Sequence, residues 1–260
     1  RPNDVTFTSS LREDLMRRDF TINAMAYNEE KGLVDLFGGI QDLNDRIIRC
    51  VGNPTERFDE DALRMFRAVR FAGQLNFNIE KETLAAIEAQ HAFLKDVSAE
   101  RIQIELLKLL ISRHPEMIRA AYETGLTSVF LPEFDRMMET PQNNPHHIYS
   151  VGDHTIHAVE TIAPNPILRL TMLLHDIAKP ETRSTDENGI DHFYNHNEAG
   201  AVLSKTILRR LKFDNQTTQM VTTLIAHHDI RFNDALGTGR KHVRRVIHSV
   251  GENLFPYLLD

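Results

Sequence analysis

Polar and apolar positions near the beginning of the chain follow two different periods. Ser9-Ser10, with Glu13 and Asp14 in the turn that follows, has the composition of a helix N-cap and predicts a helix that runs to about Tyr27. The runs 32–37 and 46–51 then alternate between apolar and polar residues, with the pair Gly38-Gly39 between them. This pattern predicts strands that flank a turn and a short helix.

From Pro54 onward the period changes, and apolar residues recur at i, i+3, i+4 and i+7, as on one face of a helix. The expected helices cover 58–75, 81–89, 98–112, 115–124, 149–161, 166–178, 198–212, 215–228 and 241–250. The stretch 140–145 is rich in Pro, Asn and Gln and has the composition of a linker. We therefore expect a mainly α protein: a small mixed α/β segment, a helical middle and a helical C-terminal domain.

Composition is that of a soluble globular protein. The 260 residues are 41% hydrophobic and 26% charged, and the length allows one large domain or two or three small ones. No apolar run approaches the roughly 18 residues that a membrane span needs. The single Cys50 cannot form an internal disulfide. We therefore expect a reducing, cytoplasmic compartment and no membrane partner.

The net charge of −7 is unfavourable for sequence-independent binding of nucleic acid, which depends on cations that neutralise phosphates. If RNA is a partner, basic side chains must be gathered locally. The candidate groups are Arg17 with Arg18, the series Arg64, Arg67 and Arg70, and the stretch 240–245. The alternative for each group is a solvated helix face.

A first polar motif comprises Arg17, Arg18, Asp19 and Asn23. On a helix Asp19 and Asn23 are four residues apart and share a face, so a carboxylate and an amide can converge on one ligand. Ribose hydroxyls suit such a pair, and the guanidiniums, that of Arg18 included, suit phosphate oxygens. We expect a nucleotide site here. The alternative is a surface helix with polar pairs.

A second motif places Asp61, Arg64 and Arg67 three residues apart on the next helix. A carboxylate accepts hydrogen bonds and a guanidinium donates them, so Asp61 and Arg64 together can match the Watson–Crick edge of a base. Cytosine and adenine both present an amino donor beside a ring-nitrogen acceptor, and one pair could serve both. The alternative is an intrahelical salt bridge worth a few tenths of a kcal/mol.

Histidines suggest a second chemistry. The chain has 13, and His154, the pair His175-Asp176, His196 and His227 fall on or at the ends of expected helices. Imidazoles and a carboxylate that arrive from several helices can hold a divalent metal, which can activate a water against a phosphoester. Mg, Mn, Ni, Co and Fe all remain candidates.

The sequence leaves a choice between candidate ligands for this metal site. His157 competes with His154, and His228 with His227. A closing carboxylate could come from Asp229 or Asp234. His196 and His227 could also be capping or surface residues.

In sequence order, the polar motifs resemble the successive blocks of the class II tRNA nucleotidyltransferases, the CCA-adding enzymes and their bacterial poly(A) polymerase relatives. The resemblance covers about residues 1–135. It rests on Arg17-Arg18-Asp19-Phe20-Thr21-Ile22-Asn23, Asp35-Leu36-Phe37-Gly38-Gly39, Glu60-Asp61-x-x-Arg64-x-x-Arg67 and Ser98-Ala99-Glu100-Arg101. In this family the last block braces the helices of the neck.

The resemblance implies roles for individual residues. Asp61 and Arg64 would be the protein template for CTP and ATP, Asp19 and Asn23 would contact the ribose side, and Arg67 would orient the nucleotide. The enzyme would add CMP and AMP to the 3′ end of tRNA with Mg²⁺. Poly(A) polymerase is the alternative within the family.

The histidine series is similar to that of the HD phosphohydrolases, over about residues 146–235. This resemblance implies that His175 and Asp176 are catalytic, on phosphoesters such as 2′,3′-cyclic or 2′-phosphate RNA ends. The expected domains are a nucleotidyltransferase head remnant (1–52), a helical neck (53–140) and an all-α HD domain (141–260). Two alternatives are an HD phosphohydrolase with an RNA-binding first half and a metal-free HD domain that binds tRNA as a scaffold.

One departure from the family concerns the segment before the first block. The family places its metal-binding carboxylates and a Gly-Ser phosphate loop there, whereas Asp4 is the only acidic residue before the first expected helix. Nucleotidyl transfer needs two metal ions held by such carboxylates. We therefore expect that the chain as given does not add nucleotides.

Overall fold

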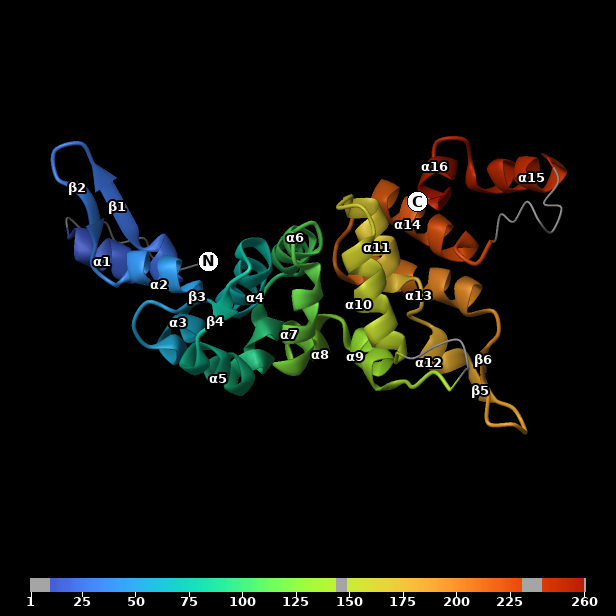
Figure 1. Cartoon of the computed structure of the whole chain (residues 1–260), viewed down its shortest axis with the longest axis horizontal. Helices are drawn as coiled ribbons and strands as arrows, with labels where there is room; N and C mark the ends of the chain where they lie inside the picture. Colours follow the sequence, from blue (N-terminus) through green and yellow to red (C-terminus); the bar gives the residue numbers. More distant parts are fainter. Residues whose placement is uncertain (1–9, 144–148, 231–239, 260) are drawn as a thin grey trace. The chain divides into compact units, whose positions relative to one another are not determined.

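The computed structural model describes residues 10–143, 149–230 and 240–259 (Figure 1). It divides into two compact units, residues 1–130 and 131–260. Both are dominated by helices, which confirms the predicted fold class. Among the helices of the described ranges, none combines the length and apolar character that crossing a membrane requires.

The first unit begins with a small mixed region. Its elements are α1 (Leu11–Met16), the 3-10 helix η1 (Thr21–Asn23), β1 (Met25–Asn28), β2 (Gly32–Asp35), α2 (Gly39–Asp45) and β3 (Ile47–Ile48). Strands β1 and β2 are antiparallel, with Met25 opposite Asp35. Asp35 accepts hydrogen bonds from the backbone N–H groups of Gly39 and Ile40 at the start of α2.

The predicted first helix is too long: α1 ends at Met16, not near Tyr27. Long-range backbone bonds replace the helix there. Asp19 accepts from the N–H of Val51, the N–H of Thr21 donates to Arg49, and the fully buried Phe20 bridges to Cys50. The local signal for a helix cannot reveal these partners, which lie about 30 residues away.

Helices form the rest of the first unit. They are α3 (Pro54–Glu60), α4 (Leu63–Leu75), α5 (Lys81–Gln90), η2 (His91–Asp96), α6 (Ala99–Leu110), η3 (Pro115–Met117), α7 (Ile118–Glu123) and α8 (Leu126–Phe130), and a two-residue strand, β4 (Asn78–Ile79), pairs with β3 in parallel. The helix predicted over 58–75 is broken at Asp61, whose backbone is extended and whose carboxylate accepts the N–H of Leu63. The core brings α4 against α6, and a Cβ added at Gly73 would lie 2.7 Å from Leu109 Cδ1.

The second unit consists of helices and one hairpin. Its elements are α9 (Pro132–Glu139), α10 (Val151–Thr161), α11 (Pro166–Leu174), α12 (Lys179–Thr182), β5 (Arg183–Thr185), β6 (Asp191–Phe193), α13 (His196–Arg210), α14 (Asn215–His227), α15 (Arg240–Val250) and α16 (Phe255–Leu259). Helix α11 packs against α10 and α14, and α13 packs against α14 (Figure 1). Antiparallel β5 and β6 were not expected from the sequence. Residues 140–143, which have linker composition, lie in this unit, where the N–H of Val151 donates to Thr140.

Candidate functional site

The first unit contains a polar cavity of about 490 Å³. Its lining includes all six side chains that the sequence marked for nucleotide binding. The lining residues are Arg17, Arg18, Asp19, Asn23, Asp61, Leu63, Arg64, Arg67 and Arg101. They come from four places in the chain: the segment after α1, the break between α3 and α4, the beginning of α4, and the first turn of α6.

Asp19 organises one side of this cavity. Its Oδ1 accepts from the side-chain amide of Asn23 (3.2 Å), and its Oδ2 accepts from Arg67 Nε (2.8 Å) and Nη2 (2.6 Å). Asp19 and Asn23 therefore do converge, although they do not share an α-helix as predicted. Asp19 precedes η1 and Asn23 ends it. The guanidinium of Arg67 neutralises a carboxylate that is only 8% exposed.

Asp61 and Arg64 face the cavity from the helix break and from α4. The alternative of an intrahelical salt bridge is corrected, because Asp61 lies outside α4 and its carboxylate accepts from the N–H of Leu63 and from Arg101, not from the guanidinium of Arg64. Its Oδ2 accepts from Arg101 Nη2 (2.6 Å). Arg64 donates to Glu60 (2.7 Å) and to the carbonyl of Arg17 (2.6 Å). Each side chain is thus held separately.

Arg101 was expected to brace helices, and the structure places it against Asp61 at the cavity wall. Burial alone would raise the pKa of Asp61, but the hydrogen bond and positive charge of Arg101 outweigh burial and lower that pKa below its ordinary value. The Asp61 carboxylate therefore stays ionised and acts only as an acceptor at neutral pH. One turn further along α6, the buried Glu105 accepts from Arg70 (2.7 Å) and anchors α6 to α4.

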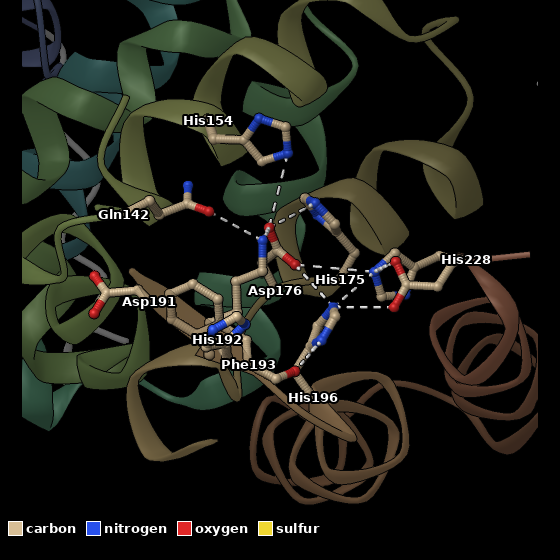
Figure 2. Close-up of a pocket in the computed structure, with 11 residues that line it drawn as sticks. Gln142, His154, His175, Asp176, Asp191, His192, Phe193, His196 and His228 are labelled. Carbon is tan, nitrogen blue, oxygen red and sulfur yellow. Dashed lines mark hydrogen bonds and ion pairs between the residues drawn. The ribbon is translucent and has the colours of Figure 1, made fainter. Parts of the chain in front are cut away.

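The second unit holds a smaller cavity of about 330 Å³ (Figure 2). Its lining is rich in histidine and aspartate. The lining residues are Gln142, His154, His175, Asp176, Lys179, Asp191, His192, Phe193, His196, His228 and Asp229. The predicted His154, His175, Asp176 and His196 therefore meet in one place.

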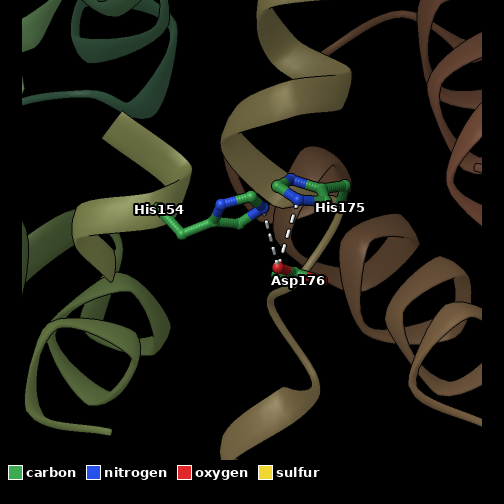
Figure 3. A group of neighbouring side chains, drawn as sticks. All are labelled: His154, His175 and Asp176. Atoms are coloured by element: carbon green, nitrogen blue, oxygen red, sulfur yellow. Dashed lines mark ion pairs between the residues drawn. The ribbon is translucent and has the colours of Figure 1, made fainter. Parts of the chain in front are cut away.

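Asp176 lies at the centre and is 1% exposed. Its Oδ2 is 3.1 Å from His175 Nε2 and 3.8 Å from His154 Nε2 (Figure 3), and 2.8 Å from Lys179 Nζ. Its Oδ1 is 3.5 Å from His196 Nε2. Burial alone would raise the pKa of Asp176, but His175 and Lys179 hold it well below the ordinary value. The carboxylate is thus an anion in a buried site.

Backbone carbonyls fix the orientation of three imidazoles. The Nδ1 atoms of His175, His196 and His228 lie 2.7, 2.8 and 2.7 Å from the carbonyl oxygens of Met172, Phe193 and Ile225. These contacts place the ring proton on Nδ1, so that in the neutral rings the Nε2 lone pairs point toward Asp176.

This donor set fits a divalent metal. Two groups of side chains, each including Asp176, have ligand atoms within 4.8 Å of one another: His154 with His175, and His196 with His228. His196 Nε2 and His228 Nε2 lie 3.3 Å apart, close enough to share a proton or to bind one metal ion together. Nucleotidyltransferase and HD domains generally use divalent metals.

His228, and not the predicted His227, joins this cluster. His227 ends α14 and turns away: its Nε2 lies 2.9 Å from the hydroxyl of Ser249. The following residue, His228, faces Asp176 at 3.9 Å. Periodicity could not separate two adjacent histidines at a helix end, because the choice depends on where the last turn stops. His157, the rival of His154, is exposed beside Glu160.

Asp229 also lines the cavity, with its carboxylate oxygens 3.4 Å from His196 Nε2 and 3.5 Å from His228 Nε2. Asp234, the other candidate for a closing carboxylate, lies outside the described residues. Asp229 therefore stands as the candidate within the described part.

Sequence reasoning missed Lys179, Gln142 and Asp191. Lys179 follows Asp176 by three residues, and its ammonium lies 3.2 Å from the side-chain carbonyl of Gln142. Asp191 is buried, yet hydrogen bonds from Arg183, Thr185 and a backbone N–H outweigh burial and lower its pKa to about 2. The spacing of Lys179 from the His-Asp pair could have identified it from the sequence. The contacts of Asp191 in the hairpin had no counterpart in any sequence pattern.

Models of known families match three stretches of the chain. Residues 1–49 match the poly A polymerase head domain, residues 76–138 match the "Probable RNA and SrmB- binding site of polymerase A", and residues 144–252 match the HD domain. Together these matches make most of the chain similar to a polymerase A head and RNA-binding region followed by an HD domain.

Individual relatives are CCA-adding enzymes. The chain is 41% identical over 235 residues to that of Levilactobacillus brevis, which covers 88% of this chain and 50% of the relative. It is 59% identical over 111 residues to that of Enterococcus faecalis, which covers 43% and 27%. The crystal structure of the Bacillus stearothermophilus enzyme in complex with CTP is similar with a TM-score of 0.65 and 27% identity, over 97% of this chain and 54% of that one. The chain spans half or less of the length of these curated relatives.

Proposed function

We propose that this chain is the nucleotide-selecting and RNA-binding part of a tRNA nucleotidyltransferase that adds CMP and AMP to the 3′ end of tRNA from CTP and ATP with Mg²⁺, fused to an HD phosphohydrolase. The observation that carries the first half is the convergence of Arg18, Asp19, Asn23, Asp61, Arg64 and Arg67 in one cavity. The CCA-adding relatives, one of them in complex with CTP, support this choice over poly(A) polymerase.

The geometry suits a choice between bases. Asp61 offers an ionised carboxylate and Arg64 offers guanidinium donors at the same cavity. Cytosine and adenine present an amino donor and a ring-nitrogen acceptor, whereas uracil and guanine present a carbonyl and a ring N–H in the corresponding places. With uracil or guanine, the carbonyl would face the carboxylate of Asp61 and the ring N–H would face the guanidinium of Arg64. Asp61 and Arg64 therefore disfavour these two bases.

The other side of the cavity suits the sugar and the phosphates. The amide of Asn23 and the carboxylate of Asp19 provide a donor and an acceptor for ribose hydroxyls. Arg67 holds Asp19 in place through two hydrogen bonds. Arg17 and Arg18 supply guanidiniums for the charge of a triphosphate.

Calorimetric titration of CTP, ATP, GTP and UTP into the chain tests this half. We expect CTP and ATP to bind and GTP and UTP to bind at least about 10-fold more weakly, since mispaired polar groups cost more than 1 kcal/mol. Asp61→Ala should abolish the preference, and the exposed Asp96→Ala is the matched control. Equal affinity for all four nucleotides would contradict the proposed template, and a preference for ATP alone would favour poly(A) polymerase.

The second half of the proposal rests on the cluster around Asp176. His154, His175, Asp176, His196 and His228 would hold a divalent cation, with Mg, Mn, Ni and Co as candidates for this donor set. When bound, the cation supplies charge neutralisation for a phosphoester and activates water.

In the reaction, the oxygen of water bonds to phosphorus, one P–O ester bond breaks and the leaving oxygen takes a proton. The chain's own residues orient the site for this step: backbone carbonyls fix the imidazoles, and Lys179 and His175 keep Asp176 ionised.

Metal content and hydrolysis of a nucleoside 2′,3′-cyclic phosphate test this half, with two adjacent histidines as a matched pair. His228→Ala should lower metal affinity and hydrolysis at least about 10-fold, because it removes a ligand, whereas His227→Ala should change neither. Equal effects of the two substitutions would contradict the assignment. A protein that binds no metal would support a tRNA-binding scaffold instead.

A further inference from the structure

Strand β6 presents two different faces. Asp191 and Phe193 turn toward the body of the unit, where Asp191 is buried and the ammonium of Lys179 lies 5.3 Å from the Phe193 ring. Alternate positions along a strand point the opposite way. His192 occupies such a position in β6, and Tyr194 is the first residue after the strand; their rings stack with centroids 5.4 Å apart and planes 8° from parallel.

The stacked rings begin at the rim of the cavity around Asp176. His192 lines that cavity and is labelled among its side chains in Figure 2. The Nε2 of His192 lies 3.1 Å from the carboxylate of Asp186 in the turn of the hairpin, and this contact holds the ring in its orientation. Tyr194, one step outward, is 69% exposed. A flat aromatic surface therefore leads from the cavity into solvent.

An exposed tyrosine contributes little to a core, so packing does not explain its place. Its chemistry suits a planar π system, since aromatic rings stack on nucleobases without regard to sequence. Nucleotides carry such a system a few bonds away from a phosphoester. The neighbouring cavity has the residues for phosphoester chemistry, and the surface beside it has the rings for a base.

We propose that His192 and Tyr194 form a stacking platform for the base of a nucleotide whose phosphoester lies at Asp176. This inference rests on the proposed phosphohydrolase function and narrows its substrates to nucleotides and RNA ends, as against small phosphoesters without a base. Tyr194 is on this view a specificity-determining residue: it binds the base and takes no part in breaking the bond.

Kinetics with a matched pair of substrates tests the platform. Adenosine 2′,3′-cyclic phosphate carries a base, and glycerol 1,2-cyclic phosphate has a similar ring without one. Tyr194→Ala should raise KM for the adenosine ester about 10-fold with little change in kcat, and should leave the base-free ester unaffected. Tyr194→Phe keeps the ring and should restore KM. Tyr27→Ala, on the hairpin of the first unit and 74% exposed, is the control and should change neither substrate.

A binding measurement gives an answer that does not depend on hydrolysis. The sequence contains no tryptophan, so Tyr194→Trp introduces a single indole, which can be excited selectively over the tyrosines. Adenosine monophosphate should quench its emission, and ribose 5-phosphate should not. Hydrolysis of both esters with equal response to Tyr194→Ala, or no quenching by adenosine monophosphate, would overturn the platform and leave the phosphohydrolase standing. Hydrolysis of neither ester would overturn the phosphohydrolase, and the quenching experiment alone would then decide whether the rings bind a base.

Discussion

The carboxylates of the two cavities are paired with different kinds of cationic side chain. In the first unit each carboxylate has a guanidinium of its own: Asp19 pairs with Arg67, and Asp61 pairs with Arg101. In the second unit Asp176 faces one ammonium, that of Lys179, and four imidazoles that are charged only when protonated. The two carboxylates of the first cavity are neutralised by guanidiniums of the protein, whereas the second cavity is rich in lone pairs and suits an added cation.

This difference bears on what each site can recognise. Permanent guanidiniums around a solvent-accessible cavity suit a polyanionic ligand that comes and goes, such as a nucleoside triphosphate. Imidazoles around an ionised carboxylate suit a divalent metal, which binds to their lone pairs in place of protons. Four substitutions test the differences between the two units, and they follow in descending order of expected effect.

The largest effect is expected from Asp176→Asn, which keeps the shape of the side chain and removes its charge. Metal affinity should fall by more than about 100-fold, since the residue is shared by both groups of candidate ligands. Elemental analysis and metal titration measure this loss. CTP affinity, measured on the same protein, should not change, and a parallel loss of CTP binding would show that the two sites are coupled.

The next effect concerns Arg101. Without its guanidinium, burial raises the pKa of Asp61, which in the wild-type chain lies below the ordinary value of 3.8. The ionised form exists above the pKa, so the loss of CTP binding on acidification should move to higher pH in Arg101→Ala. The ratio of CTP affinities at about pH 5 and pH 7 measures the shift. An unchanged ratio would mean that Arg101 does not control the ionisation of Asp61. Arg101→Lys keeps a positive charge and should bring the ratio part of the way back to the wild-type value.

A third change tests the packing that supports the first cavity. In Gly73→Ala the new methyl group would lie 2.7 Å from Leu109 Cδ1 and 2.8 Å from the carbonyl of His114, so α4 and α6 must separate. We expect a loss of about 1–3 kcal/mol in the free energy of unfolding. Gly200→Ala in α13 meets its nearest atoms at 3.4 Å and is the matched control. Denaturant unfolding measures the free energy of unfolding of both variants. Equal losses in the two would contradict the close approach of α4 and α6 at Gly73.

The smallest effect is expected at the surface. Arg136 and Glu181 form an ion pair at 2.9 Å with both side chains about half exposed. Glu181→Gln should change the free energy of unfolding by less than about 0.5 kcal/mol, because solvent and salt screen such pairs. Thermal melts at low and high salt measure it. A larger or salt-insensitive loss would show that the pair belongs to the packed interior.

Sequence periodicity predicted most helices well, because their apolar faces pack within one unit: α5, α6, α10 and α14 all begin within two residues of the expected positions. It failed where distant partners decide the backbone. Asp19 sits in a segment held by Val51, and the extended backbone at Asp61 interrupts an otherwise continuous apolar period.

The candidate sites show the same division. The identity of the side chains in the first cavity was accessible from sequence, but their pairing was not, since Arg101 reaches Asp61 from another helix. In the second cavity the choice of His228 over His227 depends on the end of one helical turn. The contribution of Asp191 depends on the hairpin of β5 and β6, which no local pattern predicted, whereas Lys179 follows Asp176 by three residues and could have been identified from the sequence.

The contacts that shape the first cavity span long stretches of chain. Arg64 meets the carbonyl of Arg17 across 47 residues, Arg67 meets Asp19 across 48, and Arg101 meets Asp61 across 40. Closing such loops costs entropy before any contact can offset it, so nonlocal contacts slow folding relative to local helix formation. We therefore expect this cavity to form after its helices, and only once the residues that line it, as far as Arg101, have left the ribosome.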